Sequence, residues 1–179
     1  MYQGADPGAG WQMTDPIYGK TPTLGSCQPQ IRRAVEKGDF IFSISGRMNK
    51  LQQYVVGGFE VDQKIHQLAA YERFPENRMV VSPQGLSGNI IIDKNGEQLP
   101  IDYHTNFQNR IDNYIIGCNP VVIESPDEVE KGRQQTIEVL NSIFSKREDS
   151  VFKIIGRCRK LDDQQVKDLV SWLEHLKMQ

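Results

Sequence analysis

The segment from Gln28 to Arg47 constrains the fold of this chain more than any other segment. Pro29 suits the first turn of a helix, because the N–H that proline lacks has no partner in a first turn. Apolar residues then recur at the spacing of one helical face: Ile31, Ala34 and Val35. Gly38 can end the helix, since glycine adopts positive φ without strain. The segment therefore predicts a short basic helix that turns at Gly38 into a buried strand starting at residues 40–42.

Short strands are predicted through the middle of the chain. The strand-like runs are residues 54–61, 79–81, 89–93, 97–101, 114–118 and 121–123. Asn95-Gly96 lies between two of these runs and is a strong hairpin signal, because both residues tolerate the positive φ of a tight turn. Residues 1–27 contain no hydrophobic run, so we expect no strand ahead of the first helix.

Helix signals become stronger toward the C-terminus. The capping box Ser125–Glu128 starts one helix, and Asp162 can cap the last one. Asp62 can cap a short helix in the middle of the chain, and residues 151–155 read as one more strand. Because strands do not alternate regularly with helices, a doubly wound parallel sheet is not favoured. We expect an α+β fold, a small and mostly antiparallel β-barrel decorated by helices, with two longer C-terminal helices.

Length and charge limit the domain organisation and the partners. A chain of 179 residues suits one domain, which we expect over residues 26–179 after a loop or arm of residues 1–25. The net charge of −2 argues against a protein that coats nucleic acid through bulk charge, so such a contact would need a local patch. No apolar run is long enough to span a membrane, and we expect no membrane contact.

The cysteines indicate the cellular location. Cys27, Cys118 and Cys158 are odd in number and widely spaced, which suits neither a disulfide framework nor a zinc site. We therefore expect a reducing, cytoplasmic location, and neither a metal nor a cofactor.

Candidate binding residues flank the first helix and strand. Arg32, Arg33 and Arg47 can form a positive rim that contacts phosphate, or can be ordinary surface arginines. Ser43 and Ser45 alternate with apolar residues along the strand, so they either hydrogen-bond a planar ligand or belong to a half-exposed strand.

Two aromatic residues lie in the N-terminal arm. Trp11 and Tyr18 are costly to leave in water, so the arm either packs partly onto the domain or is a disordered tail. Their rings can stack on a base, as aromatic platforms do, or can pack into the core.

A polar cluster surrounds the one histidine that is not expected on an amphipathic helix. His104 lies between Asp102 and Asn106, close to Arg110, and this group offers donors and acceptors for a base edge. The alternative is a solvated polar loop. His104 and Asp102 are also the candidates for general acid–base chemistry. Cys27 precedes the first helix, whose dipole could activate a thiol. No phosphate loop, nucleophile elbow, metal helix or Cys-x-x-Cys motif occurs.

Several short motifs carry a resemblance to a known family. The helix that ends in Gly-Asp before a hydrophobic strand resembles the PUA-like superfamily with its EVE, YTH and ASCH branches. More narrowly, four segments are similar to the second type of nucleotide-modification-associated domain: 18–24, 27–33, 38–41 and 107–117. The resemblance implies a small barrel that holds a nucleobase, often a modified one, in systems of DNA-base modification and phage or bacterial defence.

Three hypotheses for the function follow. The first is a protein that binds a nucleotide, a nucleic acid or a modified base. The second is an enzyme that modifies a nucleotide or base. The third is an interaction protein that uses the last helix, residues 162–178, to contact a partner or a second copy.

Overall fold

The computed structural model describes residues 5–83 and 85–178, which form two compact units. Unit 1 comprises the described parts of Met1–Gln12, Phe42–Gly58 and Val121–Gln179, and unit 2 those of Met13–Ile41 and Phe59–Pro120. The expected arm, residues 1–25, and the expected domain, residues 26–179, each contribute to both units. That residues 26–179 behave as a single domain stays a prediction.

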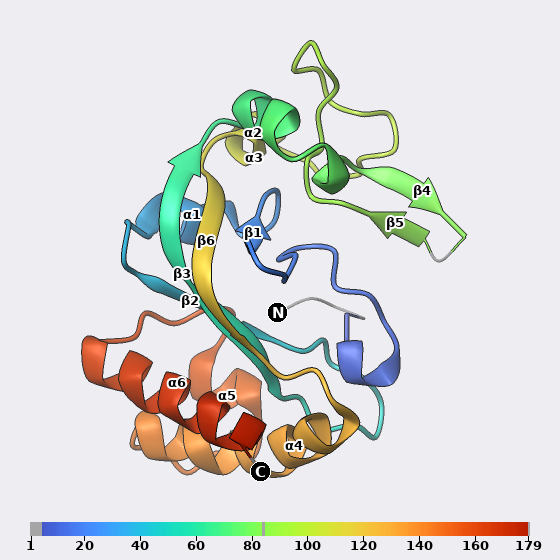
Figure 1. Cartoon of the computed structure of the whole chain (residues 1–179). Coiled ribbons are helices and arrows are strands. Elements are labelled where there is room, and N and C mark those ends of the chain that lie inside the picture. Colours follow the sequence, from blue (N-terminus) through green and yellow to red (C-terminus); the bar gives the residue numbers. More distant parts are fainter. Residues whose placement is uncertain (1–4, 84, 179) are drawn as a thin grey trace. The chain divides into compact units, whose positions relative to one another are not determined.

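The largest sheet has four strands (Figure 1). These are β1 (Thr23–Leu24), β2 (Phe40–Ile44), β3 (Val55–Ile65) and β6 (Tyr114–Val122), in the order β1-β6-β3-β2. β1 pairs antiparallel with β6. The N–H of Gly38 donates to the carbonyl of Val61 and the N–H of Ser45 to that of Tyr54, a pattern that makes β2 and β3 antiparallel. The chain is thus an α+β protein with a curled antiparallel sheet.

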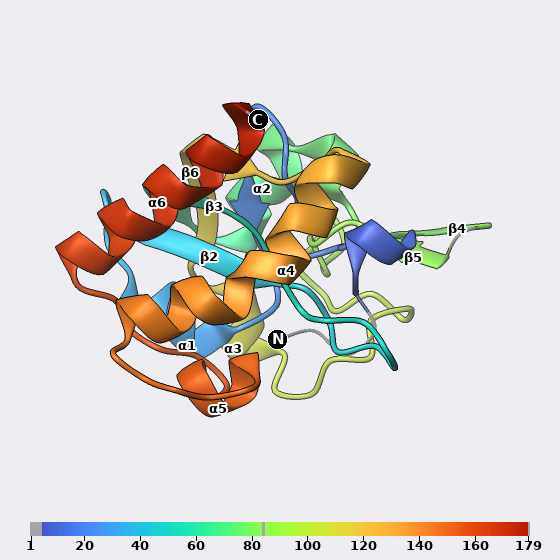
Figure 2. The same cartoon turned by 90° about the horizontal axis from the view of Figure 1, so that it is seen from below.

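Unit 1 contains the C-terminal helices. They are α4 (Pro126–Ile143), α5 (Val151–Ile155) and α6 (Asp163–Met178), after a short 3-10 helix, η1 (Pro7–Ala9). α4 and α6 lie side by side, and the chain forms α5 between them (Figure 2). Their facing side chains are buried, among them Leu140, Ile154, Leu169, Leu173 and Leu176. Burial of each such side chain is worth about 2 kcal/mol, so this apolar contact holds the helices together.

Unit 2 contains the remaining helices and a small second sheet. These elements are α1 (Pro29–Ala34), α2 (Gln67–Arg73), η2 (Pro75–Asn77), β4 (Val80–Ser82), β5 (Gly85–Ser87) and α3 (Gln108–Ile111). Side chains of β6 alternate between the two faces of the sheet. Tyr114 and Ile116 join one apolar cluster with Phe74 and Ile90, whereas Ile115 joins another with Phe59. The sheet therefore has an apolar core on both faces of unit 2.

Two local signals are confirmed. Ser125 Oγ accepts the N–H of Glu128, and the Glu128 carboxylate accepts the N–H of Ser125, which is the predicted capping box of α4. At Asn95-Gly96 the chain reverses, because the N–H of Asp93 donates to the carbonyl of Glu97 at 2.9 Å. Only an isolated bridge between Ile92 and Gln98 continues this turn, so no regular hairpin strands form there.

Two predictions about the central strands are wrong. β1 precedes α1, although its two residues were too few to appear as a hydrophobic run. Asp62 does not cap a helix but lies within β3, where its carboxylate accepts a hydrogen bond from Lys37 Nζ at 2.9 Å. α2 instead begins after His66, whose Nδ1 accepts the N–H of Leu68.

Residues 151–155 form helix α5 and not the predicted strand. Short apolar runs are ambiguous between the two structures. Here Val151 and Ile154 are three residues apart and are both buried, so one helical face meets the core of unit 1 while Phe152 points outward. Runs 114–118 and 121–123 also differ from the expectation, since they form one strand, β6.

Within the described residues, no helix combines the length and the apolar character that a membrane crossing needs.

The α4 capping box yields a stability test. We expect Ser125→Ala to lower the free energy of unfolding by about 1 kcal/mol, because the Glu128 N–H loses its acceptor. Ser125→Asp retains an acceptor and should have little effect. Ser142→Ala, at an exposed position of the same helix, is the matched control. Urea unfolding measures all three, and equal losses for Ser125→Ala and Ser142→Ala would contradict the role of the cap.

Candidate functional site

A buried carboxylate organises the loop that leads into α1. Asp15 is 2% exposed, and its oxygens accept the backbone N–H groups of Gly25, Ser26 and Cys27 at 2.8, 2.8 and 2.5 Å. Asn89 Nδ2 donates to the same carboxylate at 3.0 Å. At Gly25 a Cβ atom would collide with the Asn89 carbonyl, so glycine lets the loop close on this carboxylate. The loop conformation of Cys27 is therefore set from its N–H side by one anion.

A buried guanidinium holds the same loop from its carbonyl side. Arg32 is fully buried, and Nε donates to the Cys27 carbonyl at 2.9 Å while Nη2 donates to the Ser26 carbonyl at 3.2 Å. Its other bonds reach the carbonyls of Arg110, Asp112 and Asn113. Arg32 thus does not lie on the exposed rim that the sequence suggested. Its guanidinium joins the Cys27 loop to the chain around α3.

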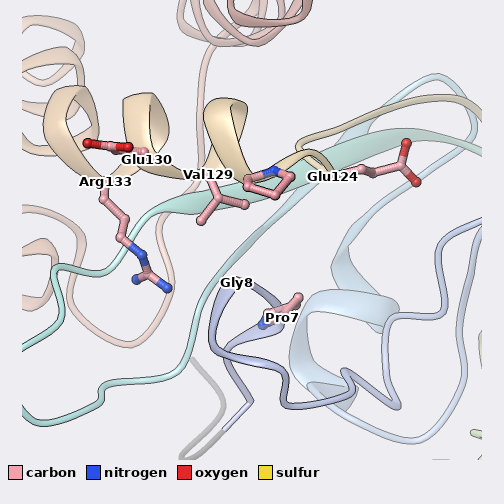
Figure 3. Close-up of a pocket in the computed structure, with 7 residues that line it drawn as sticks. Pro7, Gly8, Glu124, Val129, Glu130 and Arg133 are labelled. Carbon is pink, nitrogen blue, oxygen red and sulfur yellow. The ribbon is translucent and has the colours of Figure 1, made fainter.

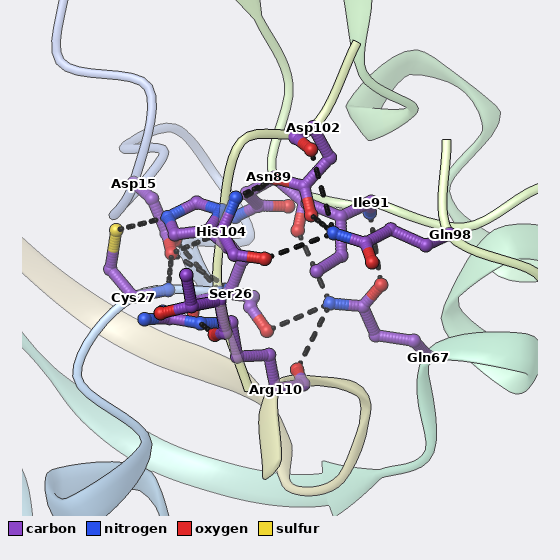
Figure 4. Close-up of polar contacts among 12 residues, drawn as sticks. Asp15, Ser26, Cys27, Gln67, Asn89, Ile91, Gln98, Asp102, His104 and Arg110 are labelled. Atoms are coloured by element: carbon purple, nitrogen blue, oxygen red, sulfur yellow. Dashed lines mark hydrogen bonds and ion pairs between the residues drawn. The ribbon is translucent and has the colours of Figure 1, made fainter. Parts of the chain in front are cut away.

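His104 is held in one orientation by two neighbours (Figure 4). Its Nδ1 lies 2.6 Å from Asp102 Oδ1, and the Asp102 side chain is 1% exposed. Gln98 Nε2 donates to the other Asp102 oxygen at 2.8 Å and to the His104 carbonyl at 3.0 Å. Because a carboxylate accepts at Nδ1, the proton of neutral His104 belongs on Nδ1, which leaves Nε2 as the acceptor.

The acceptor nitrogen of His104 faces a thiol. Cys27 Sγ lies 3.9 Å from His104 Nε2, so Cys27, His104 and Asp102 form a continuous line of three polar groups. Cys27 is partly buried against the cluster of Leu24 and Phe59, whereas 29% of the His104 side chain is exposed. A nucleophile, a base and a carboxylate that orients the base is the arrangement used in nucleophilic catalysis.

Arg110 adds positive charge beside this line. Its Nη1 donates to the Ser26 carbonyl at 2.9 Å, and its Nε donates to the Thr105 carbonyl at 2.9 Å. The guanidinium therefore bridges the loop that carries Cys27 and the loop that carries His104. Together with Arg32, which donates to the same Ser26 carbonyl, it makes the surroundings of Cys27 positive. Nearby cations favour the thiolate form of a cysteine.

Buried amides lock the support of these loops. Gln67 is fully buried, and its Nε2 donates to the carbonyls of Gly25 at 3.0 Å and Arg110 at 3.3 Å. Its Oε1 accepts the N–H of Ile91 at 3.0 Å. Because every polar atom of this amide has a partner, the loops are fixed relative to α2, and the thiol and the imidazole are presented by a rigid frame.

The other predicted site residues of unit 2 lie apart from this line. Arg33 is exposed on α1, on the solvent side of the helix from buried Arg32. Tyr18 packs edge-on against Phe59, with ring centroids 6.1 Å apart. Asn106 is exposed in the loop after His104, with a φ of 57°. Their predicted binding roles stay predictions.

Four predicted site residues belong to unit 1. Ser43 and Ser45 are 7% and 0% exposed, and Ser45 Oγ accepts the N–H of Tyr54 at 3.1 Å, which gives this hydroxyl a structural bond. Arg47 is exposed, and Trp11 is 57% exposed in the described part of the chain. The sequence grouped these residues with Arg32, but they fall in the other unit.

Unit 1 also has a hollow of about 290 Å³ (Figure 3). It is lined by Pro7, Gly8, Glu124, Pro126, Val129, Glu130 and Arg133. The Arg133 guanidinium already binds Asp6 Oδ1 and the Gln52 carbonyl, each at 2.6 Å. The described lining contains no thiol, hydroxyl or imidazole, so we place the candidate site in unit 2.

Sequence reasoning identified His104, Asp102 and Arg110 but did not connect them to Cys27. The thiol and the imidazole are 77 positions apart, a separation that follows no local spacing rule. Asp15 and Gln98 were missed altogether, since a single acidic or amide residue in a loop carries no signal of burial. The one available hint was the position of Cys27 directly before α1.

Comparisons with known proteins add no assignment: no family model, no curated protein and no solved structure matches this chain.

The Asp15 carboxylate yields a second stability test. We expect Asp15→Asn to lower the free energy of unfolding by at least about 2 kcal/mol, because an amide N–H₂ would face N–H groups that need an acceptor. The control is Asp112→Asn, whose side chain is 65% exposed and should matter by less than about 0.5 kcal/mol. Equal effects in urea unfolding would mean that Asp15 does not hold the loop.

Proposed function

We propose that this protein is an enzyme in which Cys27 is the nucleophile, His104 the general base and Asp102 the group that orients the base. The observation that carries this proposal is the line Cys27 Sγ–His104 Nε2–His104 Nδ1–Asp102 Oδ1, with separations of 3.9 and 2.6 Å. It favours the second of the three hypotheses drawn from the sequence.

The reaction class is attack of a thiol on an electrophilic carbon, such as an acyl carbon. The Cys27 proton moves to His104 Nε2 while sulfur forms a bond to that carbon. The bond from the carbon to its leaving group breaks, and the leaving group takes the proton from His104. Water, deprotonated by His104, then attacks the same carbon, the C–S bond breaks and the thiol is restored. Asp102 stabilises the imidazolium in both halves.

The substrate we propose is a nucleotide or a modified base. This part rests on the resemblance of residues 18–41 and 107–117 to nucleotide-modification-associated domains. Arg110 supports it, because a guanidinium at the edge of the site suits an anionic substrate. The same expectation permits a second candidate function, in which the cluster binds the base through His104 and Arg110 without altering it.

Selective alkylation tests the activated thiol. At pH 7 we expect iodoacetamide to label Cys27 about tenfold faster than exposed Cys158, because neighbouring cations and His104 favour the thiolate. Cys118 should react slowest, since burial, with the nearby carboxylates of Glu60 and Asp62, raises its pKa and so reduces its thiolate fraction at this pH. Peptide mass spectrometry measures the three rates in one sample.

Substitution of the base completes this test. His104→Asn should slow labelling of Cys27 and leave Cys118 and Cys158 unchanged. His175→Asn, at an exposed position of α6, is the matched control and should change none of the three rates. Faster labelling of Cys158 than of Cys27, together with no effect of His104→Asn, would identify Cys27 as an ordinary thiol.

A substrate panel separates catalysis from binding. We expect intact-mass spectrometry of the chain with nucleotides, modified bases and activated acyl esters to reveal a covalent adduct on Cys27, because the thiolate attacks the electrophile. Cys27→Ser should abolish the adduct. A non-covalent complex that persists in Cys27→Ser, with no adduct, would favour the binding function instead. Neither an adduct nor a complex at millimolar concentration would reject both functions.

A further inference from the structure

Unit 1 has a basic surface around α5 that takes no part in the thiol site. Residues 146–160, here named the α5 surface, contain six cations: Lys146, Arg147, Lys153, Arg157, Arg159 and Lys160. The acidic residues in this segment are Glu148 and Asp149, so its formal charge is +4 in a chain whose net charge is −2. The rest of the chain is therefore acidic, and positive charge is concentrated at one place.

Contacts gather these cations around one short helix. Lys146 Nζ donates to the carbonyls of Lys153 at 3.0 Å and Ile154 at 2.6 Å. Arg159 Nη1 lies 3.4 Å from the Ile154 carbonyl, and its guanidinium lies over the Phe144 ring at 4.7 Å. Two cations from opposite sides of α5 thus meet at the same carbonyl. They are held in place, so their charges lie at a defined position.

The remaining cations face solvent. Arg147, Arg157 and Lys160 are exposed. Lys153 is also exposed but is paired with Asp149 at 2.8 Å, so we count it as largely compensated. Arginine side chains present a planar fork of donors that matches a phosphate group.

An exposed aromatic ring lies among these charges. Phe152 is 55% exposed, although Val151 and Ile154 of the same helix are 1% and 0% exposed. α5 therefore buries one apolar face in unit 1 and presents a phenyl ring to solvent. Aromatic rings beside cations form the platforms on which the bases of single-stranded nucleic acids stack.

We propose that the α5 surface binds single-stranded nucleic acid, with the phosphates on Arg147, Arg157 and Lys160 and a base stacked on Phe152. A lipid surface suits this site less well. Phe152 is the one large apolar side chain exposed among residues 146–160, and interfacial insertion needs a broader apolar face. An anionic bilayer would also meet the acidic remainder of the chain, whereas a narrow strand need not.

Fluorescence anisotropy with a labelled 20-nucleotide oligo-dT tests this proposal. Arg157→Glu combined with Lys160→Glu should weaken binding at least about tenfold and reduce the slope of log K against log salt by about 2. The matched control, Lys94→Glu with Lys167→Glu, changes the net charge equally at exposed positions elsewhere and should weaken binding less than about twofold. Circular dichroism verifies that both double variants are folded.

Two further arms identify the ligand class and the independence of the site. Phe152→Ala should weaken binding of oligo-dT about fivefold or more and leave binding of a duplex nearly unchanged, because duplex bases cannot stack on the ring. Cys27→Ser should bind oligo-dT as the native chain does. Equal losses in the two double variants, absence of binding at 100 mM salt and about 0.1 mM protein, or binding only to phosphatidylserine vesicles would each overturn the proposal.

Discussion

The geometry of the candidate site depends on one buried anion. Asp15 gathers three consecutive backbone N–H groups and the amide of Asn89, and no other group in the described chain binds so many donors of this loop. Such a carboxylate in the interior is stable only when hydrogen bonds replace its hydration. The loop and the anion therefore require each other. Arg32 completes the balance by placing a cation on the carbonyl side of the same residues.

This balance has a consequence for the chemistry of Cys27. Asp15 alone would oppose a thiolate in its neighbourhood, because like charges repel at short range in a protein interior. Arg32 and Arg110 both donate to the Ser26 carbonyl and so offset that repulsion. The Cys27 N–H is already bound by Asp15, so it is not free to stabilise an oxyanion. Charge stabilisation of a reacting carbonyl would have to come from Arg110 or from the substrate itself.

Local signals predicted local structure, and long-range contacts were beyond them. The capping box at Ser125 and the turn at Asn95-Gly96 are decided within four residues, and the structure contains both. Residues 151–155 failed as a strand because the choice depended on which face the core of unit 1 would bury.

Arg32 illustrates the same limit for the site. A sequence shows a basic helix, but the carbonyls of residues 110–113 that draw the side chain inside are about 80 positions away. His104, Asp102 and Arg110 were recognised because they are neighbours in sequence. Their relation to Cys27 exists only in the folded chain.

The order of the chain also decides when the thiol can act. During synthesis Cys27 leaves the ribosome 77 residues before His104, and the carbonyls that anchor Arg32 follow later still. Until that second half arrives, Cys27 has neither a base nor a fixed loop, and its thiol is an ordinary one. The nascent chain thus carries its nucleophile in an unarmed form, and completion of the fold, not translation of the cysteine, switches its reactivity on.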